Sequence, residues 1–354
     1  PRSSGHWNLH NTGQTGGADD ADIDAPEAWA MTTGSPEIVV AVHDVGMQLD
    51  HPDLAGNLFV NADEVPGNGI DDDGNGWVDD VHGLDVSLDN QFTPAIEHDG
   101  DPSPGNAFDN HGTAVAGVIA AEADNGIWIS GVAPGVRIMP IRLGVSNDSG
   151  SFAVTVAGMA SAVYYAAGRT ADGTGTWRGA DVANHSYGTG AELPALSEAF
   201  EWAAEFGRGG RGLANFVAAG NSGTSSVGYP ANLSTTIAVG ATGHGGLRSA
   251  YSQYGPALDF VAPGGDAPSN GWIWTTDRTG ADGYVSGSYV GINGTSFAAP
   301  TAAGIAALML SIDPGLGWDE IRDVMRETAD HDKVAGVAFD GNGFNLEYGY
   351  GWLN

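Results

Sequence analysis

Two hydrophobic patterns alternate along the chain: short, largely apolar runs, and longer stretches whose apolar residues recur at helical spacing. A short apolar run predicts a strand that is buried on both faces of a sheet. Such strands are predicted at residues 38–42, 215–219, 236–240 and 258–262. Helices are predicted at residues 112–122, 154–167, 193–206, 297–312 and 318–328. This alternation predicts a three-layer α/β fold, with a mostly parallel central sheet and helices on both faces.

The domain organisation is predicted to be simple, because no proline- or serine-rich linker and no internal repeat interrupts the pattern. Residues 1–354 are therefore expected to form one domain, a length that a large α/β core can fill. The segment from about residue 61 to 109 departs from the pattern, since it is rich in Asp, Asn and Gly. A loop of this length in a compact domain is usually functional or held by a ligand.

The composition narrows the classes of function. Twelve basic residues stand against 44 acidic ones, which gives a net charge of −32. Such a surface repels nucleic acids and anionic membranes, and it suits cation binding or a salty medium as much as simple solvation. The chain has no cysteine, which excludes disulfides and a thiol nucleophile. It also has no run of 18 apolar residues, so no segment is expected to span a membrane.

Four polar residues stand where predicted strands end or helices begin, the edge at which parallel sheets carry their active sites. They are Asp44, His111, Asn221 and Ser296. Each alone has an ordinary explanation: a strand-end turn, a solvated histidine, an Asn-Gly-type turn and a helix cap. Together they supply a nucleophile, its base, a carboxylate that orients the base, and an amide for a developing oxyanion.

At these residues the sequence resembles the subtilisin-like serine proteases, the subtilases, from about residue 7 to 354. The motifs that carry the resemblance are residues 38–54, 110–121, 131–134, 184–188, 218–223, 228–231, 294–304 and 349–354. The resemblance implies the subtilisin-like fold. It also implies that Ser296 attacks the scissile carbonyl, His111 moves the proton, Asp44 orients the imidazole, and Asn221 binds the oxyanion with the Ser296 N–H.

The resemblance also implies a substrate site, in which residues 186–188 pair with an extended peptide as an added strand. The predicted substrate-binding residues are Ser186, Tyr187, Gly188, Ala218, Ala219, Gly220 and Gly228. None of them is acidic, so an apolar or aromatic preference is expected. The chain departs from the common family pattern at Val45, Ala114 and Phe297, which are conservative packing changes beside an intact triad.

A calcium loop is predicted within the Asp-rich segment. Oxygen ligands at alternate positions, with a glycine at the sixth place, resemble the start of an EF-hand loop. The predicted ligands are Asp71, Asp73, Asn75, the Trp77 carbonyl and Asp79. The twelfth place is His82 instead of Glu, so a structural site is expected and not a sensor. The alternative is a solvated acidic loop, although its carboxylates would repel one another without a cation.

The resemblance implies a second calcium site. Its predicted side-chain ligands are Asp53 and Asn125, with Asp22 matching a ligand in part of the family. Carbonyl groups of Ala123, Ile127 and Ile129 would complete it. Zinc is a poor alternative, because the ten histidines form no H-E-x-x-H motif and have no cysteine partners.

The sequence thus predicts a secreted, monomeric, calcium-dependent serine endopeptidase acting on proteins and peptides. The start of the chain lacks a signal-peptide pattern and is interpreted as that of a mature form, whose removed propeptide would be an inhibitor. Two alternatives remain open. One is an acyl-transferase or cyclising enzyme with the same triad, and the other is a non-catalytic calcium-binding adhesion module.

Overall fold

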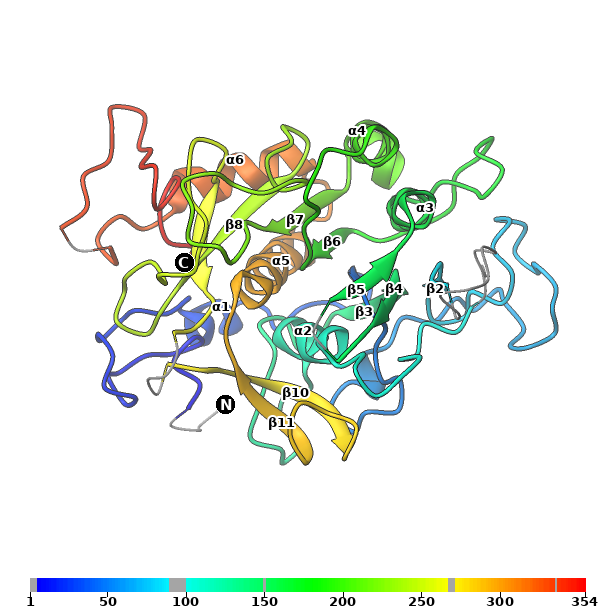
Figure 1. The fold of residues 1–354 in the computed structure, drawn as a ribbon, viewed down its shortest axis with the longest axis horizontal. Helices are drawn as coiled ribbons and strands as arrows, with labels where there is room; N and C mark the ends of the chain where they lie inside the picture. Colours follow the sequence, from blue (N-terminus) through cyan, green and yellow to red (C-terminus); the bar gives the residue numbers. More distant parts are fainter. Residues whose placement is uncertain (1–4, 89–99, 149–150, 267–270, 335) are drawn as a thin grey trace.

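A seven-stranded parallel sheet forms the centre of the computed structural model, in the order β2-β3-β1-β6-β7-β8-β9 (Figure 1). The structure describes residues 5–88, 100–148, 151–266, 271–334 and 336–354. The strands are β1 (Val39–Asp44), β2 (Leu84–Asp85), β3 (Arg137–Arg142), β6 (Val182–His185), β7 (Ala214–Ala218), β8 (Ile237–Thr242) and β9 (Phe260–Pro263). This confirms the predicted α/β class with a parallel central sheet.

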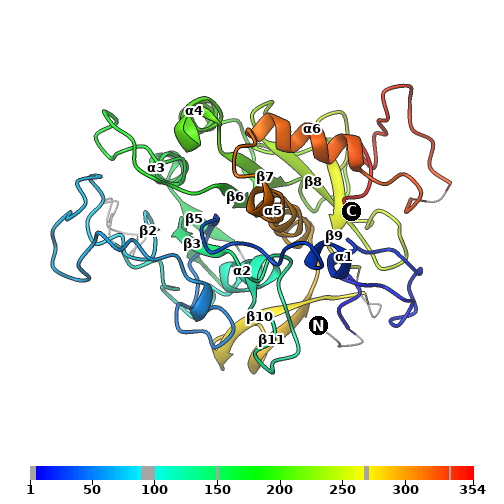
Figure 2. The same ribbon diagram turned by 180° about the vertical axis from the view of Figure 1, so that it is seen from behind.

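Helices cover both faces of the sheet (Figures 1 and 2). The main helices are α2 (His111–Ala120), α3 (Val156–Ala166), α4 (Pro194–Gly210), α5 (Thr295–Ile312) and α6 (Trp318–Thr328). Val40 and Val42 of β1 belong to the apolar cluster of α2 and α5, whereas Val39 and Ala41 belong to that of α3 and α4. Successive strand residues point to opposite faces, so this alternation shows one helix pair on each side.

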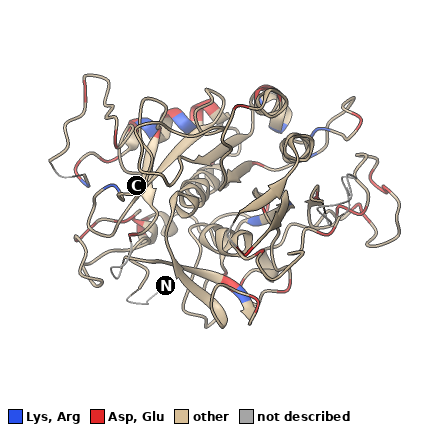
Figure 3. Cartoon of the chain, in the orientation of Figure 1, with Lys and Arg blue, Asp and Glu red and all other residues tan. Residues whose placement is uncertain are grey.

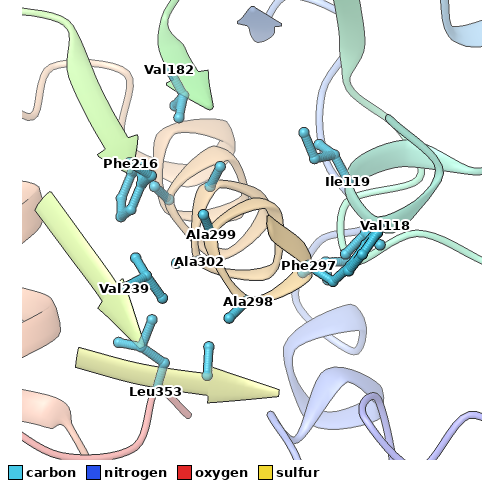
Figure 4. Packing of buried hydrophobic residues seen from close by; sticks show 14 of the residues in the cluster. Val118, Ile119, Val182, Phe216, Val239, Phe297, Ala298, Ala299, Ala302 and Leu353 are labelled. Atoms are coloured by element: carbon cyan, nitrogen blue, oxygen red, sulfur yellow. The ribbon is translucent and has the colours of Figure 1, made fainter. Parts of the chain in front are cut away.

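Helix α5 lies at the middle of the larger apolar cluster (Figure 4). Its alanines, including Ala299 and Ala302, allow close packing against Phe216 of β7 and Val239 of β8. By length and composition α5 is the one described helix that could cross a membrane, but 72% of this helix is buried inside the protein. We therefore interpret it as a core helix.

Four further strands form two hairpins outside the main sheet. One pairs β4 (Gly144–Ser146) with β5 (Phe152–Val154), and the other pairs β10 (Ile273–Gly280) with β11 (Gly287–Ile292). A short helix α1 (Ala25–Trp29) and a 3-10 turn η1 (Ala55–Asn57) complete the described elements. The second hairpin packs along α2, and it returns the chain to the start of α5.

The Asp-rich segment of residues 61–109 contains only the short strand β2 among its described residues, and residues 89–99 of this predicted insertion lie outside the described part. Acidic side chains are spread over the loops around the sheet, and α6 carries both acidic and basic residues (Figure 3). Each predicted helix and strand is present in the structure. The observed strands that were not predicted are β2, β3, β4, β5, β6, β10 and β11.

Candidate active site

The predicted catalytic residues come together at the carboxyl ends of the central strands. Asp44 is the last residue of β1, and it pairs in register with Arg142 at the end of β3. On the other side His43 is in register with His185, after which the chain continues to Ser186. Parallel strands end at one edge of their sheet, so these residues lie at the same edge.

Asp44 and His111 form a hydrogen-bonded pair. The Asp44 Oδ2 atom lies 2.8 Å from His111 Nδ1, and Asp44 Oδ1 accepts a hydrogen bond of 2.8 Å from the Val45 N–H. The residue after His111 must be small, because a Cβ on Gly112 would lie 2.2 Å from the Gly46 carbonyl oxygen. Glycine therefore lets the start of α2 approach the end of β1.

The protonation of His111 follows from this pair. Because a carboxylate only accepts, the Nδ1 atom carries the proton and Nε2 is left as the basic atom. Burial of the ring lowers the pKa of His111, but the charge of Asp44 and the hydrogen bond to it outweigh this effect. The pKa of His111 is therefore raised above its ordinary value of 6.5. The pair with Asp44 therefore makes the His111 ring a stronger base than an isolated imidazole.

A buried arginine holds the segment that leads to His111. Arg142 lies 2.5 Å from Asp85 and 4.0 Å from Asp109, measured between nitrogen and carboxylate oxygen. The Asp109 carboxylate also accepts hydrogen bonds from the N–H groups of Gly105, Asn106 and Ser146. These contacts join the strand edge to the residues just before α2, so they fix the position of His111 at the start of α2.

Ser296 is the second residue of α5, where helix N–H groups lack partners within the helix. Its Oγ donates a hydrogen bond of 3.4 Å to the Ser186 carbonyl, and Ser186 Oγ donates one of 2.8 Å to the Ser296 carbonyl. The ring of Phe297 lies 5.7 Å from that of His111, between centroids. The start of α5 therefore lies beside both His111 and the segment after β6.

Thr295 fixes the orientation of the exposed Asn221 amide. Asn221 Oδ1 accepts hydrogen bonds from the Thr295 N–H at 2.9 Å and the Thr295 Oγ1 at 2.8 Å. A backbone N–H can only donate, so this atom is the oxygen and the Nδ2 donors point elsewhere. An ideal Cβ on Gly294 would lie 3.6 Å from Asn221 Nδ2 and 3.7 Å from the Ser296 nitrogen. Both nitrogen atoms therefore lie within 4 Å of one point beside Gly294. The sequence did not single out Thr295 as the residue that orients the Asn221 amide.

The predicted substrate-binding residues lie on two neighbouring segments. Residues 186–188 follow β6 and lie outside the named strands, and Thr189 forms a bridge with Tyr229. Residues 218–220 end and follow β7, where the Gly228 N–H donates to the Ala219 carbonyl at 3.1 Å. The structure therefore brings Ala219 and Gly228 into contact, and Ser186 into contact with Ser296. Their part in substrate binding stays a prediction.

Two histidines with no exposed surface stack beneath this edge. The rings of His43 and His185 lie 4.2 Å apart between centroids, and the interplanar angle is 26°. His185 Nε2 lies 3.0 Å from Asn215 Oδ1, and His43 Nε2 lies 3.2 Å from the Ala162 carbonyl oxygen. Burial lowers the pKa of His43 to about 4, and burial together with the neighbouring ring lowers the pKa of His185 well below 6.5. Both rings are therefore neutral in the folded protein at neutral pH.

We expect this pair to destabilise the fold in mild acid. Below pH 6.5 the unfolded chain binds protons that folded His43 does not, so stability is lost as the pH falls from 6.5 towards 4. The loss for His43 alone is roughly 3 kcal/mol over this range, at about 1.4 kcal/mol per pH unit. Urea unfolding between pH 7 and 4 measures it. In a His43→Gln/His185→Gln variant the free energy of unfolding should depend less on pH than in the parent. His10→Gln, at an exposed site, should keep the pH dependence of the parent. An equal pH dependence in the double variant and the parent would contradict the prediction.

One candidate cation site contains Asp53 and Asn125. Asn125 Nδ2 donates to Asp53 Oδ1, and Asp53 Oδ2 is buried and has no hydrogen-bond partner in the described part of the chain. Burial raises the pKa of Asp53 from 3.8 to about 6. An unpartnered buried carboxylate oxygen fits a hard cation such as calcium, as predicted for this pair. Ile129 is buried nearby in the same loop as Asn125, and the carbonyl ligands stay a prediction.

In the Asp-rich loop the structure gathers Asp71 and Asp73 with Glu64, with one carboxylate oxygen of each within 4.8 Å of the others. The sequence missed Glu64, because it lies outside the alternating spacing. The predicted ligand Asp79 accepts hydrogen bonds from the N–H groups of Asn68 and Gly69 and is not in this group. Asn75 Oδ1 accepts from the Trp77 N–H, and Asn75 Nδ2 donates to Asp73.

Asp22 lies beside two other carboxylates and a buried ammonium group. One carboxylate oxygen each of Asp20, Asp22 and Asp24 lies within 4.8 Å of the others. The Asp22 carboxylate accepts N–H donors from Asn11 and Asp24 and lies 3.8 Å from the Lys333 ammonium, which is 2.8 Å from Asp24. Lys333 is the only lysine of the chain, and its side chain is 3% exposed. No spacing in the sequence predicts this pairing, because Asp22 and Lys333 are 311 positions apart. The role of Asp22 as a calcium ligand stays a prediction.

Comparison with known proteins identifies the family of this chain. A model of the subtilase family, peptidase family S8, matches residues 35–351. The chain belongs to the subtilase family. Among the relatives of this subtilase, the "calcium-dependent protease" of Trichormus variabilis is 33% identical over 368 residues, covering 98% of this chain and 50% of the relative. Thermitase of Thermoactinomyces vulgaris is 31% identical over 315 residues, covering 89% of this chain and 88% of thermitase.

Solved structures agree with this assignment. A protease of Pseudoalteromonas arctica PAMC 21717 matches the subtilase with a TM-score of 0.74 and 26% identity, covering 99% of this chain and 95% of the other. A serine protease of Aeromonas sobria matches with a TM-score of 0.76 and 23% identity, which supports the fold. The chain spans about half the length of the calcium-dependent proteases that it matches.

Proposed function

We propose that this subtilase is a serine endopeptidase that hydrolyses polypeptides through Ser296, His111 and Asp44. The observation that carries the proposal is the 2.8 Å hydrogen bond between Asp44 Oδ2 and His111 Nδ1, formed beside the start of α5 in a chain of this family. A serine hydroxyl is a weak nucleophile until a base takes its proton, and this pair leaves His111 Nε2 able to do so.

We propose the following steps for the reaction. Ser296 Oγ attacks the scissile carbonyl carbon while its proton passes to His111 Nε2. The carbonyl oxygen becomes an oxyanion, which the Ser296 N–H and Asn221 Nδ2 stabilise as preset donors. His111 then gives the proton to the leaving amine, and the acyl-enzyme forms. A water molecule, deprotonated by His111, attacks the acyl-enzyme and regenerates Ser296.

Substrate class and setting are further parts of the proposal. The acyl half of the polypeptide would lie along residues 186–188 and 218–220, where no acidic side chain is present to favour a basic residue. We expect apolar or aromatic residues to be preferred there. The net charge of −32 suits an extracellular enzyme in a salty medium, and a propeptide inhibitor is expected as the partner before maturation.

We also infer that calcium stabilises this subtilase, as the name of its relative in Trichormus variabilis says of that protein. Asp53 and Asn125 would hold one ion, and Glu64, Asp71 and Asp73 a second. The ions would supply positive charge where the grouped carboxylates otherwise repel one another and where an oxygen of Asp53 lacks a partner.

Replacing Asp53 with asparagine should make the protein more stable than the parent in chelator but less stable than the parent in calcium. Without a cation, ionising buried Asp53 at neutral pH costs roughly 3 kcal/mol, since its pKa of about 6 lies above 3.8. In chelator, stability should therefore fall as the pH rises from about 4 to about 6. Asp53→Asn should be more stable than the parent in chelator and less stable in calcium, by urea unfolding at pH 7. A parent indifferent to chelator would contradict the inference.

The proposed function is tested by separating hydrolysis from acyl transfer and from mere binding. The parent is incubated with casein and with a fluorophosphonate probe, and the products are analysed by mass spectrometry. Labelling at Ser296 with the appearance of free carboxyl and amino ends supports the endopeptidase. Ligated products with labelling would favour an acyl-transferase, and a folded chain that is neither labelled nor active would favour a binding module.

A further inference from the structure

The hairpin of β10 and β11 lies beside the candidate triad. Thr275 Oγ1 and Thr276 Oγ1 donate hydrogen bonds of 2.7 and 2.6 Å to the carbonyl groups of Ala114 and Thr113 in α2. From these contacts β10 continues towards the end of α2 that begins with His111. In Figures 1 and 2, α2 lies between α5 and this hairpin. The hairpin is therefore on the side of His111 that faces away from α5.

The end of the hairpin is fastened to the two segments that carry Asp44 and His111. The Thr279 N–H donates a 2.8 Å hydrogen bond to Gln48 Oε1, and Gln48 Nε2 donates one of 2.9 Å to Thr279 Oγ1. Arg278 Nη1 donates a 2.6 Å hydrogen bond to the Asn106 carbonyl. Gln48 follows β1 and Asn106 precedes α2, so the hairpin is tied to both sides of the catalytic pair.

A buried carboxylate makes the turn of the hairpin rigid. Asp277 has no exposed surface, and its oxygens accept hydrogen bonds of 2.9 Å from the N–H groups of Arg278, Tyr284 and Val285. The side chains of Tyr284 and Val285 are nevertheless 44% and 46% exposed. Two adjacent apolar side chains are thus presented to solvent on a fixed backbone, an arrangement that limits the entropy lost when a ligand covers them.

Tyr284 also lies close enough to the pair to respond to its charge. Enclosure of its hydroxyl group, followed by the charges of Asp44 and Asp277, raises the pKa of Tyr284. Ser186, which contacts Ser296, belongs to the segment after β6 and not to the α2 side of the site. The segment after β6 and the hairpin turn with Tyr284 therefore form different surfaces beside the catalytic residues.

We propose that Tyr284 and Val285 form an apolar subsite for the leaving half of the polypeptide, the part released as the amine. The inference rests on the proposed function. His111 protonates that amine, so the leaving half must pass over His111, away from the acyl half at residues 186–188. The hairpin turn is the rigid surface on that side. An apolar side chain placed against it would be preferred over a polar one by about tenfold, as for a small apolar pocket.

Internally quenched peptides test the subsite. They share one acyl half and carry Leu, Phe, Ser or Asp at the first and second positions after the scissile bond. The parent should cleave the Leu and Phe peptides about tenfold faster than the Ser peptides, in kcat/KM. A Tyr284→Ser/Val285→Ser variant should reduce that preference to about twofold or less. Leu247→Ser, an exposed apolar residue on another loop, is the matched control and should keep the parent preference.

An ester with the same acyl half and a methoxy leaving group separates this subsite from damage to the triad. The Tyr284→Ser/Val285→Ser variant should hydrolyse the ester at the parent rate. An unchanged peptide preference in the variant would overturn the subsite, and so would an equal loss on ester and peptides. A parent that cleaves peptides with no preference on the leaving side would also overturn it. A parent that hydrolyses neither substrate would refute the proposed function itself.

Discussion

Replacing Ser296 with alanine should lower kcat about a million-fold, the size of effect found when the nucleophile of the relative subtilisin is removed. The other hydroxyl at the start of α5, Thr295 Oγ1, donates to Asn221 Oδ1, so we expect no neighbouring residue to take over. KM should change little, because Ser296 Oγ makes only a long 3.4 Å contact, to the Ser186 carbonyl. Peptide hydrolysis under saturating conditions, followed for hours with concentrated variant, measures the drop.

The matched control is the other serine of the same helix. Ser311 lies in the last turn of α5, where its Oγ donates to the Ala307 carbonyl at 2.7 Å and accepts from the Ser35 N–H at 3.0 Å. Ser311→Ala should keep kcat within about twofold, although loss of both partly buried hydrogen bonds can lower stability by about 2 kcal/mol. Both variants should have the circular dichroism spectrum of the parent. Retention of even one per cent of the parent kcat by Ser296→Ala would show that another group is the nucleophile.

The fold was predictable from sequence where the apolar pattern is strong. Strands β1, β7, β8 and β9 and the five main helices were predicted to within a few residues, because each must bury an apolar face or run. Strand β6 was missed because its last residues, Asn184 and His185, are polar. In the folded protein Asn184 Nδ2 donates to Ser186 Oγ, and His185 Nε2 lies 3.0 Å from Asn215 Oδ1. Strand β3 was missed for a similar reason, since Pro140 interrupts its pattern.

The candidate site was predictable to the extent that its chemistry lies in local motifs. Asp44, His111, Asn221 and Ser296 each stand in a short segment that shows its strand end or helix start. Contacts between distant segments were not predictable, because no spacing encodes them. The ammonium of Lys333 beside Asp22 is such a case. Glu64 was missed for another reason, because it lies near Asp71 and Asp73 in the chain but outside their alternating spacing. The bracing of Asn221 by Thr295 was missed because a threonine before a helix reads first as a cap.

Replacing Asn221 with alanine should lower kcat about 100- to 1000-fold, the range known for loss of the corresponding donor in the relative subtilisin. The oxyanion develops only after attack, so this donor acts in the transition state and KM should stay within about twofold. The convergence of Asn221 Nδ2 and the Ser296 nitrogen near Gly294 is the geometric reason for the expectation. Steady-state kinetics on one quenched peptide separate kcat from KM. Ser222→Ala, at the exposed neighbouring residue, is the control and should leave both constants unchanged.

Thr295 makes the same prediction sharper, because it holds the amide oxygen and leaves the donor atoms free. Thr295→Val keeps the N–H that donates to Asn221 Oδ1 but removes Oγ1, which donates to Asn221 Oδ1 at 2.8 Å and accepts from the Gly220 N–H at 3.2 Å. Loss of the hydrogen bond to Asn221 is worth about 1 kcal/mol, so kcat should fall about fivefold. In an Asn221→Ala background the same change should have almost no further effect on kcat, since no amide remains to be oriented. Full additivity of the two losses would mean that Thr295 affects kcat independently of Asn221, and that the orientation of Asn221 is set by something else.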